Sequence, residues 1–250
     1  MSIEGIYSAL SFNLWVANVT EERQKRVIEA VKLLDADTVG FQEASPQWMN
    51  ILKNSLSDEY GFVGCGRDGG ENGEHNPIFY KKSRFTLVSE GTMWLSDTPH
   101  EVSKHPDSSL NRIFTHAVLR CNDTGVNIHF VNTHFDHIGE TARQSQAVIL
   151  CDYIKGAGGL PTVLTGDFNT GPESPAYKTI TAGGMKDSSL AAKKSRRTAT
   201  FINFGRAKEY IDFIFTSSEV EDCEYLAYDG KVNGDYPSDH LPIFAKYRIK

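Results

Sequence analysis

The feature that most restricts the fold of this chain is a series of short apolar segments with the length and composition of β-strands. In Ile211-Asp-Phe-Ile-Phe215, for example, apolar side chains occupy both faces of the expected strand. Such a strand must be covered on both sides, by helices or by a second sheet. Many strands with few helical stretches therefore predict a layered α+β sandwich, in a single domain that spans residues 1–250.

Turn residues and hydrophobic periodicity divide the chain into elements. Strands are expected at residues 6–14, 38–41, 78–80, 85–94, 113–120, 126–133, 162–165, 200–204, 210–215, 224–228 and 242–249. Helices are expected after Thr20, which can cap one, after Ser45, where Pro46 suits the first helical position, and over residues 140–154. Residues 64–77 form a glycine-rich loop.

Charge and cysteine content exclude several classes of protein. A net charge of -6 argues against a protein that coats duplex DNA by phosphate neutralisation alone. The four cysteines form no CxxC pair, which excludes the usual zinc spacings and offers no disulfide framework. No export signal or membrane-length apolar run occurs, so a cytoplasmic protein with no membrane partner is expected, with a monomer favoured.

Polar residues at the ends of two apolar strands are candidates for chemistry. Asp167 and Asn169 follow one strand, and their spacing of two places both on one face, where an acid and an amide can activate a water and hold an oxyanion. An Asx-rich turn is the alternative. Alternation likewise puts Asn132, His134 and Asp136 on one face of another strand, and it puts His137 opposite His134, which argues against a metal site shared by the two histidines.

Glu43 and Asn13 each place a hard oxygen donor in or beside an apolar segment, where an unpaired polar group is costly. A divalent cation would account for both, and carboxylate and amide oxygens favour Mg²⁺, with Mn²⁺ as a possible substitute, over zinc. Ordinary buried hydrogen bonding is the alternative. Asp212 interrupts an apolar strand and needs a partner, and His240, between Pro237 and Pro242, is a natural one.

In chain order, these pieces resemble the endonuclease/exonuclease/phosphatase superfamily, and in the stretch 166–177 its deadenylase-type branch. The resemblance implies a four-layer α/β/β/α sandwich with two central, mainly antiparallel sheets. The residues that carry it are Asn13, Gln42-Glu43, Asn132-Thr-His134, Gly166-Asp-Phe-Asn169, Ile211-Asp-Phe213 and Ser238-Asp-His240.

The resemblance also implies roles for these residues. Glu43, with Asn13 nearby, would hold Mg²⁺, and Asp239 would support the metal or its waters. The other residues would serve an in-line attack of water on phosphorus. Asp167 would activate or orient the water, Asn169 would bind the phosphoryl oxygens, His134 would contact the scissile phosphate, and Asp212 would orient His240, which would stabilise the transition state.

The substrate is less constrained by the sequence than the reaction. The expected substrate is a phosphate ester. The favoured function is a nuclease or nucleotide phosphodiesterase that acts on single-stranded nucleic acid or a nucleotide. A phosphatase that acts on a small phosphomonoester is the first alternative. An inactive binding module is the remaining alternative. Arg67, on a rim with Asp68 and Glu74, is assigned to substrate binding together with Arg112 and Asp136, and an ordinary ion pair is the alternative for Arg112. The basic run 193–197 is interpreted as a solvated loop, with contact to a phosphate backbone as the alternative.

Overall fold

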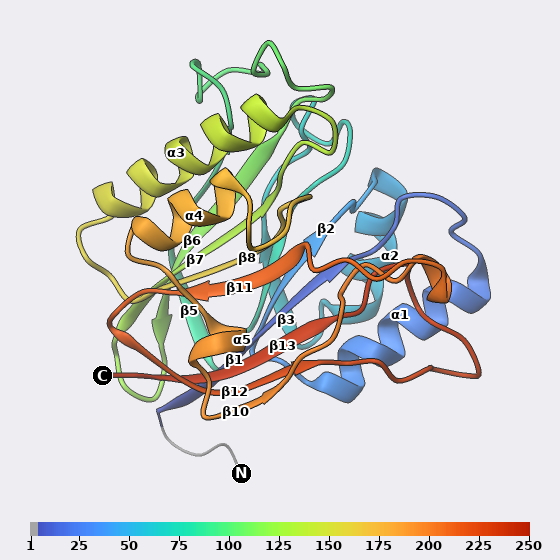
Figure 1. The fold of residues 1–250 in the computed structure, drawn as a ribbon. Coiled ribbons are helices and arrows are strands. Elements are labelled where there is room, and N and C mark those ends of the chain that lie inside the picture. Colours follow the sequence, from blue (N-terminus) through green and yellow to red (C-terminus); the bar gives the residue numbers. More distant parts are fainter. Residues whose placement is uncertain (1–4) are drawn as a thin grey trace.

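Two β-sheets pack face to face in the computed structural model, which describes residues 5–250 (Figure 1). The strands are β1 (Ile6–Asn13), β2 (Thr38–Gln42), β3 (Tyr60–Val63), β4 (Ile78–Lys81), β5 (Phe85–Trp94), β6 (Ile113–Cys121), β7 (Asn127–His134), β8 (Thr162–Asp167), β9 (Lys186–Asp187), β10 (Lys194–Arg196), β11 (Asp212–Thr216), β12 (Val220–Ala227) and β13 (Ile243–Ile249). The helices are α1 (Glu21–Leu34), α2 (Pro46–Leu56), α3 (Glu140–Gly156), α4 (Pro175–Ala182) and α5 (Ser188–Ala191).

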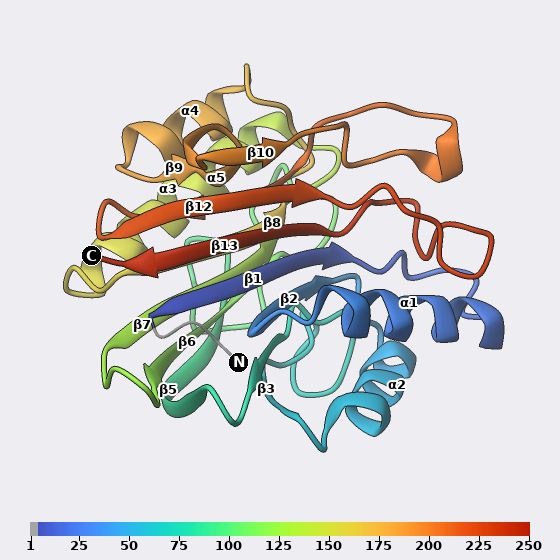
Figure 2. The same ribbon diagram turned by 90° about the horizontal axis from the view of Figure 1, so that it is seen from below.

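The sheets and helices form the expected four layers. One sheet has seven strands in the order β10-β12-β13-β1-β2-β4-β3, and the other has six in the order β5-β6-β7-β8-β11-β9. Figure 2 shows β12, β13 and β1 running side by side in the seven-stranded sheet. Most strand pairs are antiparallel, but β1–β2, β7–β8 and β10–β12 are parallel. The prediction of an α/β/β/α sandwich is therefore confirmed.

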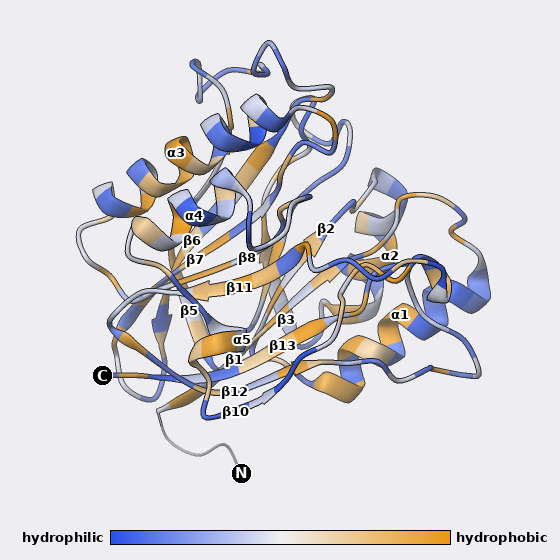
Figure 3. Cartoon of the chain, viewed as in Figure 1, coloured by the Kyte–Doolittle hydropathy of each residue, from blue (hydrophilic) through white to orange (hydrophobic). Residues whose placement is uncertain are grey.

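Three buried apolar clusters hold these layers together. The central cluster lies between the sheets and includes Tyr7, Ala117 and Ile214. A second cluster joins α1 and α2 to the seven-stranded sheet, and a third joins α3 and α4 to the other sheet. In Figure 3 the central strand β11 is largely apolar while the helices α1 and α3 carry both apolar and polar residues, which is the pattern of a strand covered on both faces and of helices covered on one.

The helix starts follow their capping residues. Thr20 accepts a hydrogen bond from the Arg23 N–H at the start of α1, and Ser45 accepts one from the Trp48 N–H at the start of α2. Each bond satisfies a backbone donor that has no partner inside the helix. Helix α3 begins at Glu140, as expected.

The strand expected at residues 200–204 is wrong. This segment makes only isolated bridges at Phe201, and Asn203–Gly205 form a 3₁₀ turn in which Asn203 and Phe204 have φ angles of 42° and 54°. Left-handed backbone cannot continue a strand. The basic run is also more ordered than a solvated loop, since Lys194–Arg196 form the edge strand β10 and Arg196 pairs with Asp229 at 2.7 Å.

Across residues 5–250, none of the helices combines the length and the apolar character needed to cross a bilayer. Residues 1–4, the start of the segment in which no export signal is expected, lie outside the described residues. The four cysteines are free thiols, as expected.

Candidate active site

Strand register brings the predicted site residues into rows at one end of the two sheets. In the six-stranded sheet, β7 pairs with β8 so that His134 lies opposite Asp167, and β8 pairs with β11 so that Asp167 lies opposite Asp212. In the seven-stranded sheet, Asn13 lies opposite Gln42, and Glu43 follows directly. Residues far apart in the chain are therefore neighbours because of the strand pairing.

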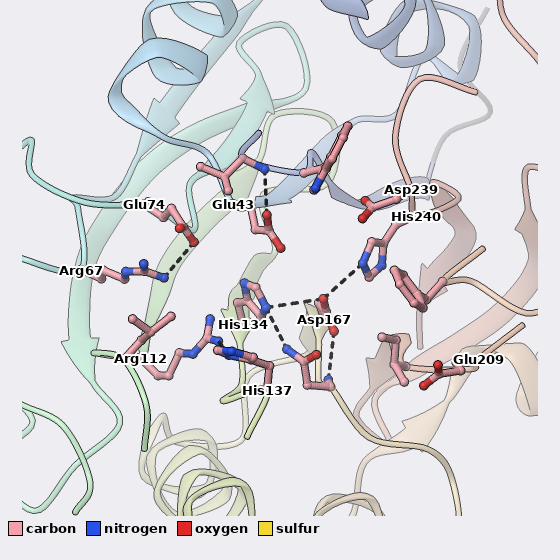
Figure 4. Close-up of a pocket in the computed structure, with 16 residues that line it drawn as sticks. Glu43, Arg67, Glu74, Arg112, His134, His137, Asp167, Glu209, Asp239 and His240 are labelled. Carbon is pink, nitrogen blue, oxygen red and sulfur yellow. Dashed lines mark hydrogen bonds and ion pairs between the residues drawn. The ribbon is translucent and has the colours of Figure 1, made fainter. Parts of the chain in front are cut away.

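A pocket of about 410 Å³ opens over these rows (Figure 4). Its lining includes charged side chains from both sheets and from the loops between them. In Figure 4, Glu43 and Asp239 lie on one side of Asp167 and His134, and Arg67, Glu74 and Arg112 lie opposite His240.

Asp167 is the most connected carboxylate of the pocket. Its Oδ2 accepts a hydrogen bond from Asn13 Nδ2 at 2.8 Å, and it lies 3.5 Å from His134 Nε2 and 3.7 Å from His240 Nε2. Its Oδ1 accepts the backbone N–H of Asn169 at 2.9 Å. Burial and the negative charge of Asp212 raise the pKa of Asp167 to about 7, although His240 opposes the shift.

His240 is held by Asp212, as the sequence predicts. The distance from His240 Nδ1 to Asp212 Oδ2 is 2.8 Å, and both side chains are buried. Burial by itself lowers the pKa of an imidazole, but the charges of Asp212 and Asp167 outweigh it and raise the pKa of His240 to about 10. The ring is therefore an imidazolium at neutral pH, with Nε2 toward Asp167.

Glu43, Asn13 and Asp239 come together near the same end of the pocket. Asn13 Nδ2 donates to Glu43 Oε1 at 3.1 Å as well as to Asp167, whereas Asn13 Oδ1 accepts the N–H of Trp15 at 2.9 Å. The amide thus turns its nitrogen, and not its oxygen, toward the carboxylates. Burial raises the pKa of Asp239, and the charge of Glu43 raises it further against the effect of His240.

The donor set fits a divalent cation. Glu43, Asp167 and Asp239 all line the pocket with carboxylates, and hard oxygen donors are what Mg²⁺ prefers. A second grouping, Asp167, Asp212 and His240, has ligand atoms within 4.8 Å of one another. In that grouping, however, Asp212 is already bonded to the imidazole.

Asn169 and His134 contact each other at the floor of the pocket. Asn169 Nδ2 lies 2.9 Å from His134 Nε2 and donates to the Phe135 carbonyl at 3.0 Å, so the two N–H groups of this amide are directed at protein atoms. Burial, together with the charge of Arg112, lowers the pKa of His134, and its imidazole is neutral. In this arrangement His134 Nε2 accepts a hydrogen bond from the amide.

Asp136 lies behind the pocket wall, where its side chain is fully buried and its oxygens accept several hydrogen bonds from protein groups. Donors within 3.0 Å are the hydroxyls of Ser108 and Ser109 and the N–H groups of Ser109, Ile138 and Gly139. Arg112 Nε is 3.5 Å from Asp136 Oδ2. The structure therefore places Asp136 in support of Arg112, away from the pocket lining.

The prediction that His134 and His137 face opposite sides of one strand is wrong. Strand β7 ends at His134, so alternation no longer applies three residues later, and both histidines line the pocket. Arg112 Nη2 lies 3.0 Å from His137 Nδ1.

Three lining residues, Trp15, Phe201 and Glu209, carried no role in the sequence interpretation, and no local signal pointed to them. Glu74 belongs to the rim that was predicted together with Arg67.

The family model described as the endonuclease/exonuclease/phosphatase family matches residues 10–240. No curated protein sequence matches the chain. A solved family member from Bacteroides vulgatus is 33% identical with a TM-score of 0.92, covering 98% of this chain and 99% of its own. One from Bacteroides thetaiotaomicron is 31% identical with a TM-score of 0.93, covering 100% of both chains.

A third solved structure is the mannosyl-6-phosphatase of Bacteroides thetaiotaomicron. It is 31% identical with a TM-score of 0.90, and the match covers 96% of this chain and 99% of that one. Since the family model spans most of the sequence, including the residues that meet in the pocket, the chain belongs to the endonuclease/exonuclease/phosphatase family of phosphoester hydrolases.

Proposed function

We propose that this protein is a divalent-cation-dependent phosphatase that releases phosphate from a small phosphomonoester, with sugar phosphates as the favoured class. The observation that carries the proposal is a pocket of about 410 Å³ that joins the Asp167–His240–Asp212 relay to two arginines. That volume is in the range of small-molecule sites. The full-length likeness to a mannosyl-6-phosphatase supports the sugar phosphate.

A nuclease or nucleotide phosphodiesterase, which the sequence favours, has less support from the surface charges. Extended nucleic-acid contacts need unpaired basic side chains along the backbone path. The net charge is -6, and in the basic run Lys193 pairs with Glu221 while Arg196 pairs with Asp229. A compact substrate therefore suits this chain better.

Glu43 and Asp239 would hold the cation, with Asp167 close by and Asn13 bracing two of these carboxylates. A bound Mg²⁺ would neutralise charge on the phosphoryl oxygens and help to orient a water. The backbone of Glu43 is left-handed, with φ of 56°, and Val16 N–H donates to its Oε2 at 2.7 Å. Strain of this kind persists where the surroundings hold it, and here it aims a carboxylate into the pocket.

Asp167 is assigned the role of general base, and His240 the role of stabilising negative charge on the phosphoryl group. Asp167, with its raised pKa, can take a proton from the attacking water. His240 is protonated, so its Nε2–H can donate to a phosphoryl oxygen as negative charge develops there. Asp212 keeps the imidazole charged and oriented through Nδ1.

Hydrolysis assays with the purified protein test this proposal. With Mg²⁺, we expect faster release from p-nitrophenyl phosphate and a hexose 6-phosphate than from bis-p-nitrophenyl phosphate or single-stranded RNA. A chelator should abolish turnover, and added Mg²⁺ or Mn²⁺ should restore it. Asp167→Asn and His240→Gln should each lower kcat by a factor of about 100 or more, the contribution usual for acid–base groups.

Faster cleavage of the diester or of RNA would instead support the nuclease or phosphodiesterase alternative. No turnover of any ester would support a binding module of the same fold. Lys25→Met, at an exposed position of α1, is the control for the purification, and its activity should match that of the unaltered protein.

A further inference from the structure

The wall of the pocket opposite His240 consists of Arg67, Glu74 and Arg112 (Figure 4). Arg67 and Glu74 come from the glycine-rich loop, and Arg112 immediately precedes β6. None of the three belongs to the acid–base relay or to the carboxylates assigned to the cation. A substrate with its scissile phosphate at Asp167 and His240 would place its remaining part against this wall.

Both arginines of the wall already have a carboxylate partner. Arg67 Nη1 lies 2.8 Å from Glu74 Oε2, with the two side chains 14% and 17% exposed. Arg112 Nε lies 3.5 Å from Asp136 Oδ2, and both of those side chains are buried. No other lysine or arginine of residues 5–250 lines this pocket. A second phosphate would thus meet no unpaired basic side chain here.

Glu74 has an oxygen available to a ligand. Its Oε2 is bonded to Arg67, whereas no hydrogen bond within the described chain engages Oε1. Burial raises the pKa of Glu74, and Arg67 counters that shift by stabilising the charged form. A half-desolvated carboxylate with a free oxygen is a strong acceptor for a hydroxyl donor.

The backbone holds Glu74 in place relative to the cation side of the pocket. The Arg67 N–H donates to the Glu74 carbonyl at 3.0 Å, and the neighbouring His75 exchanges two backbone hydrogen bonds with Ala44. Ala44 directly follows Glu43. The acceptor oxygen is therefore carried on a segment tied to the Glu43 turn, as a specificity contact requires.

We infer that Glu74, backed by Arg67, forms a hydroxyl-binding subsite that receives the uncharged, hydroxylated body of the substrate and excludes a second phosphate. The inference rests on the proposed phosphatase function and narrows it to monophosphates of sugars or similar polyols. The carboxylate acts twice, as an acceptor for a hydroxyl and as the charge that neutralises Arg67. Two substitutions can separate these effects.

Glu74→Gln keeps the shape of the side chain and removes its charge. We expect kcat/KM for a hexose 6-phosphate, relative to that for p-nitrophenyl phosphate, to fall about tenfold, the usual value of one hydrogen bond to a charged group. The ratio for a hexose 1,6-bisphosphate relative to the monophosphate should rise, because Arg67 is released. Glu74→Asp keeps the charge, but its shorter side chain moves the carboxylate oxygens away from the substrate. It should therefore lower the ratio of hexose 6-phosphate to p-nitrophenyl phosphate without raising the ratio of bisphosphate to monophosphate.

Glu71→Gln is the matched control, because Glu71 lies in the same loop with its side chain 77% exposed. Both ratios should match those of the unaltered protein. Calorimetric titration of the monophosphate and bisphosphate into an Asp167→Asn background should reproduce the same changes in affinity, independent of turnover. Thermal unfolding of each variant shows that it is folded.

Two results would overturn the inference while leaving the proposed function intact. One is unchanged ratios in folded Glu74→Gln, and the other is an unaltered enzyme that already prefers the bisphosphate. If the unaltered protein hydrolyses no phosphomonoester, the proposed function itself fails and this subsite fails with it.

Discussion

The contact between Asp212 and His240 helps to keep the imidazole protonated at neutral pH. Loss of the Asp212 carboxylate should affect turnover far more than substrate binding, because Asp212 contacts the imidazole and not the substrate. For Asp212→Asn we expect kcat to fall about 100-fold or more, with little change in KM. Steady-state kinetics with p-nitrophenyl phosphate measure both constants.

Asp222→Asn is the matched control, since Asp222 is also a buried aspartate. Ser188 and Thr216 donate to it at 2.6 and 2.8 Å, outside the pocket lining. This variant should lose thermal stability and keep kcat within about twofold. An Asp212→Asn enzyme with nearly normal kcat would show that His240 needs no orienting carboxylate.

Helix α1 contributes a buried arginine that organises the segment after β1. Arg23 is 2% exposed and lies over the rings of Trp15 and Trp48, at 5.2 and 4.9 Å. Burial lowers its pKa to about 10, so it remains charged at neutral pH. Its guanidinium donates to the backbone carbonyls of Leu14, Trp15, Ala17, Asn18 and Pro237.

Replacing Arg23 by methionine should remove the guanidinium donors from these carbonyls, among them the carbonyl of the buried Leu14. We expect the free energy of unfolding to fall by about 3 kcal/mol or more, as is usual when buried polar groups lose their partners. Because the same segment supplies the Val16 N–H to Glu43, the Mg²⁺ concentration for half-maximal activity should rise severalfold. Urea denaturation and metal titration measure the two effects.

Lys25→Met tests the same helix at an exposed position and should change stability by no more than about 0.5 kcal/mol. An Arg23→Met protein with unaltered stability and metal requirement would contradict the role assigned to the guanidinium.

The contact between α3 and the six-stranded sheet contains a buried histidine. His129, on β7, is 1% exposed, its ring lies 5.7 Å from that of Tyr153, and its Nδ1 has no partner within residues 5–250. Burial, with a smaller effect of His116, lowers the pKa of His129 to about 4. In the unfolded chain a histidine titrates near 6.5.

The unfolded chain therefore binds more protons at this position below about pH 6.5, and stability should fall as the pH decreases from there to about 4. The shift corresponds to about 3 kcal/mol over that window. His129→Leu should remove about this much of the pH dependence of the unfolding free energy, measured by urea denaturation. The difference between the proteins at pH 7.5 gives the packing cost separately, and an unchanged pH slope would refute the assignment.

The two sheets are joined beneath the pocket by a polar network inside an otherwise apolar interface. Asn132 Oδ1 accepts from Gln42 Nε2 at 2.7 Å and from Thr165 Oγ1 at 3.0 Å, so it connects both sheets. Its Nδ2 donates to the Phe41 carbonyl at 2.7 Å. Such a network specifies how the sheets align, because each buried polar group needs its partner.

Gly40 leaves the space that this network needs. A Cβ at this position would overlap Thr165 Oγ1 and lie 2.6 Å from Asn132 Oδ1. Gly40→Ala should therefore lower the free energy of unfolding by about 2 kcal/mol or more, through overpacking and a displaced hydrogen bond. Gly156→Ala, at the end of α3 with no atom within 4 Å of the added carbon, should be neutral or slightly stabilising. Equal stabilities in urea denaturation would contradict the close approach of the sheets.

The sequence alone predicted the layered architecture and the candidate residues of the site. Strands apolar on both faces, helix caps at Thr20 and Ser45, and polar residues at strand ends are local signals, because they depend on residue type and short spacing. They were sufficient for the sandwich and for the meeting of Asp212 with His240.

Only the tertiary structure decided how those residues share their contacts. Alternation misplaced His137 because the strand ends at His134, and the strand expected at 200–204 is a turn held by left-handed residues. The assignment of Asp136 behind Arg112, and the pairing of Glu74 with Arg67, depend on which side chains meet across loops. Such contacts depend on how the loops fold against one another in space, so no local sequence pattern specifies them.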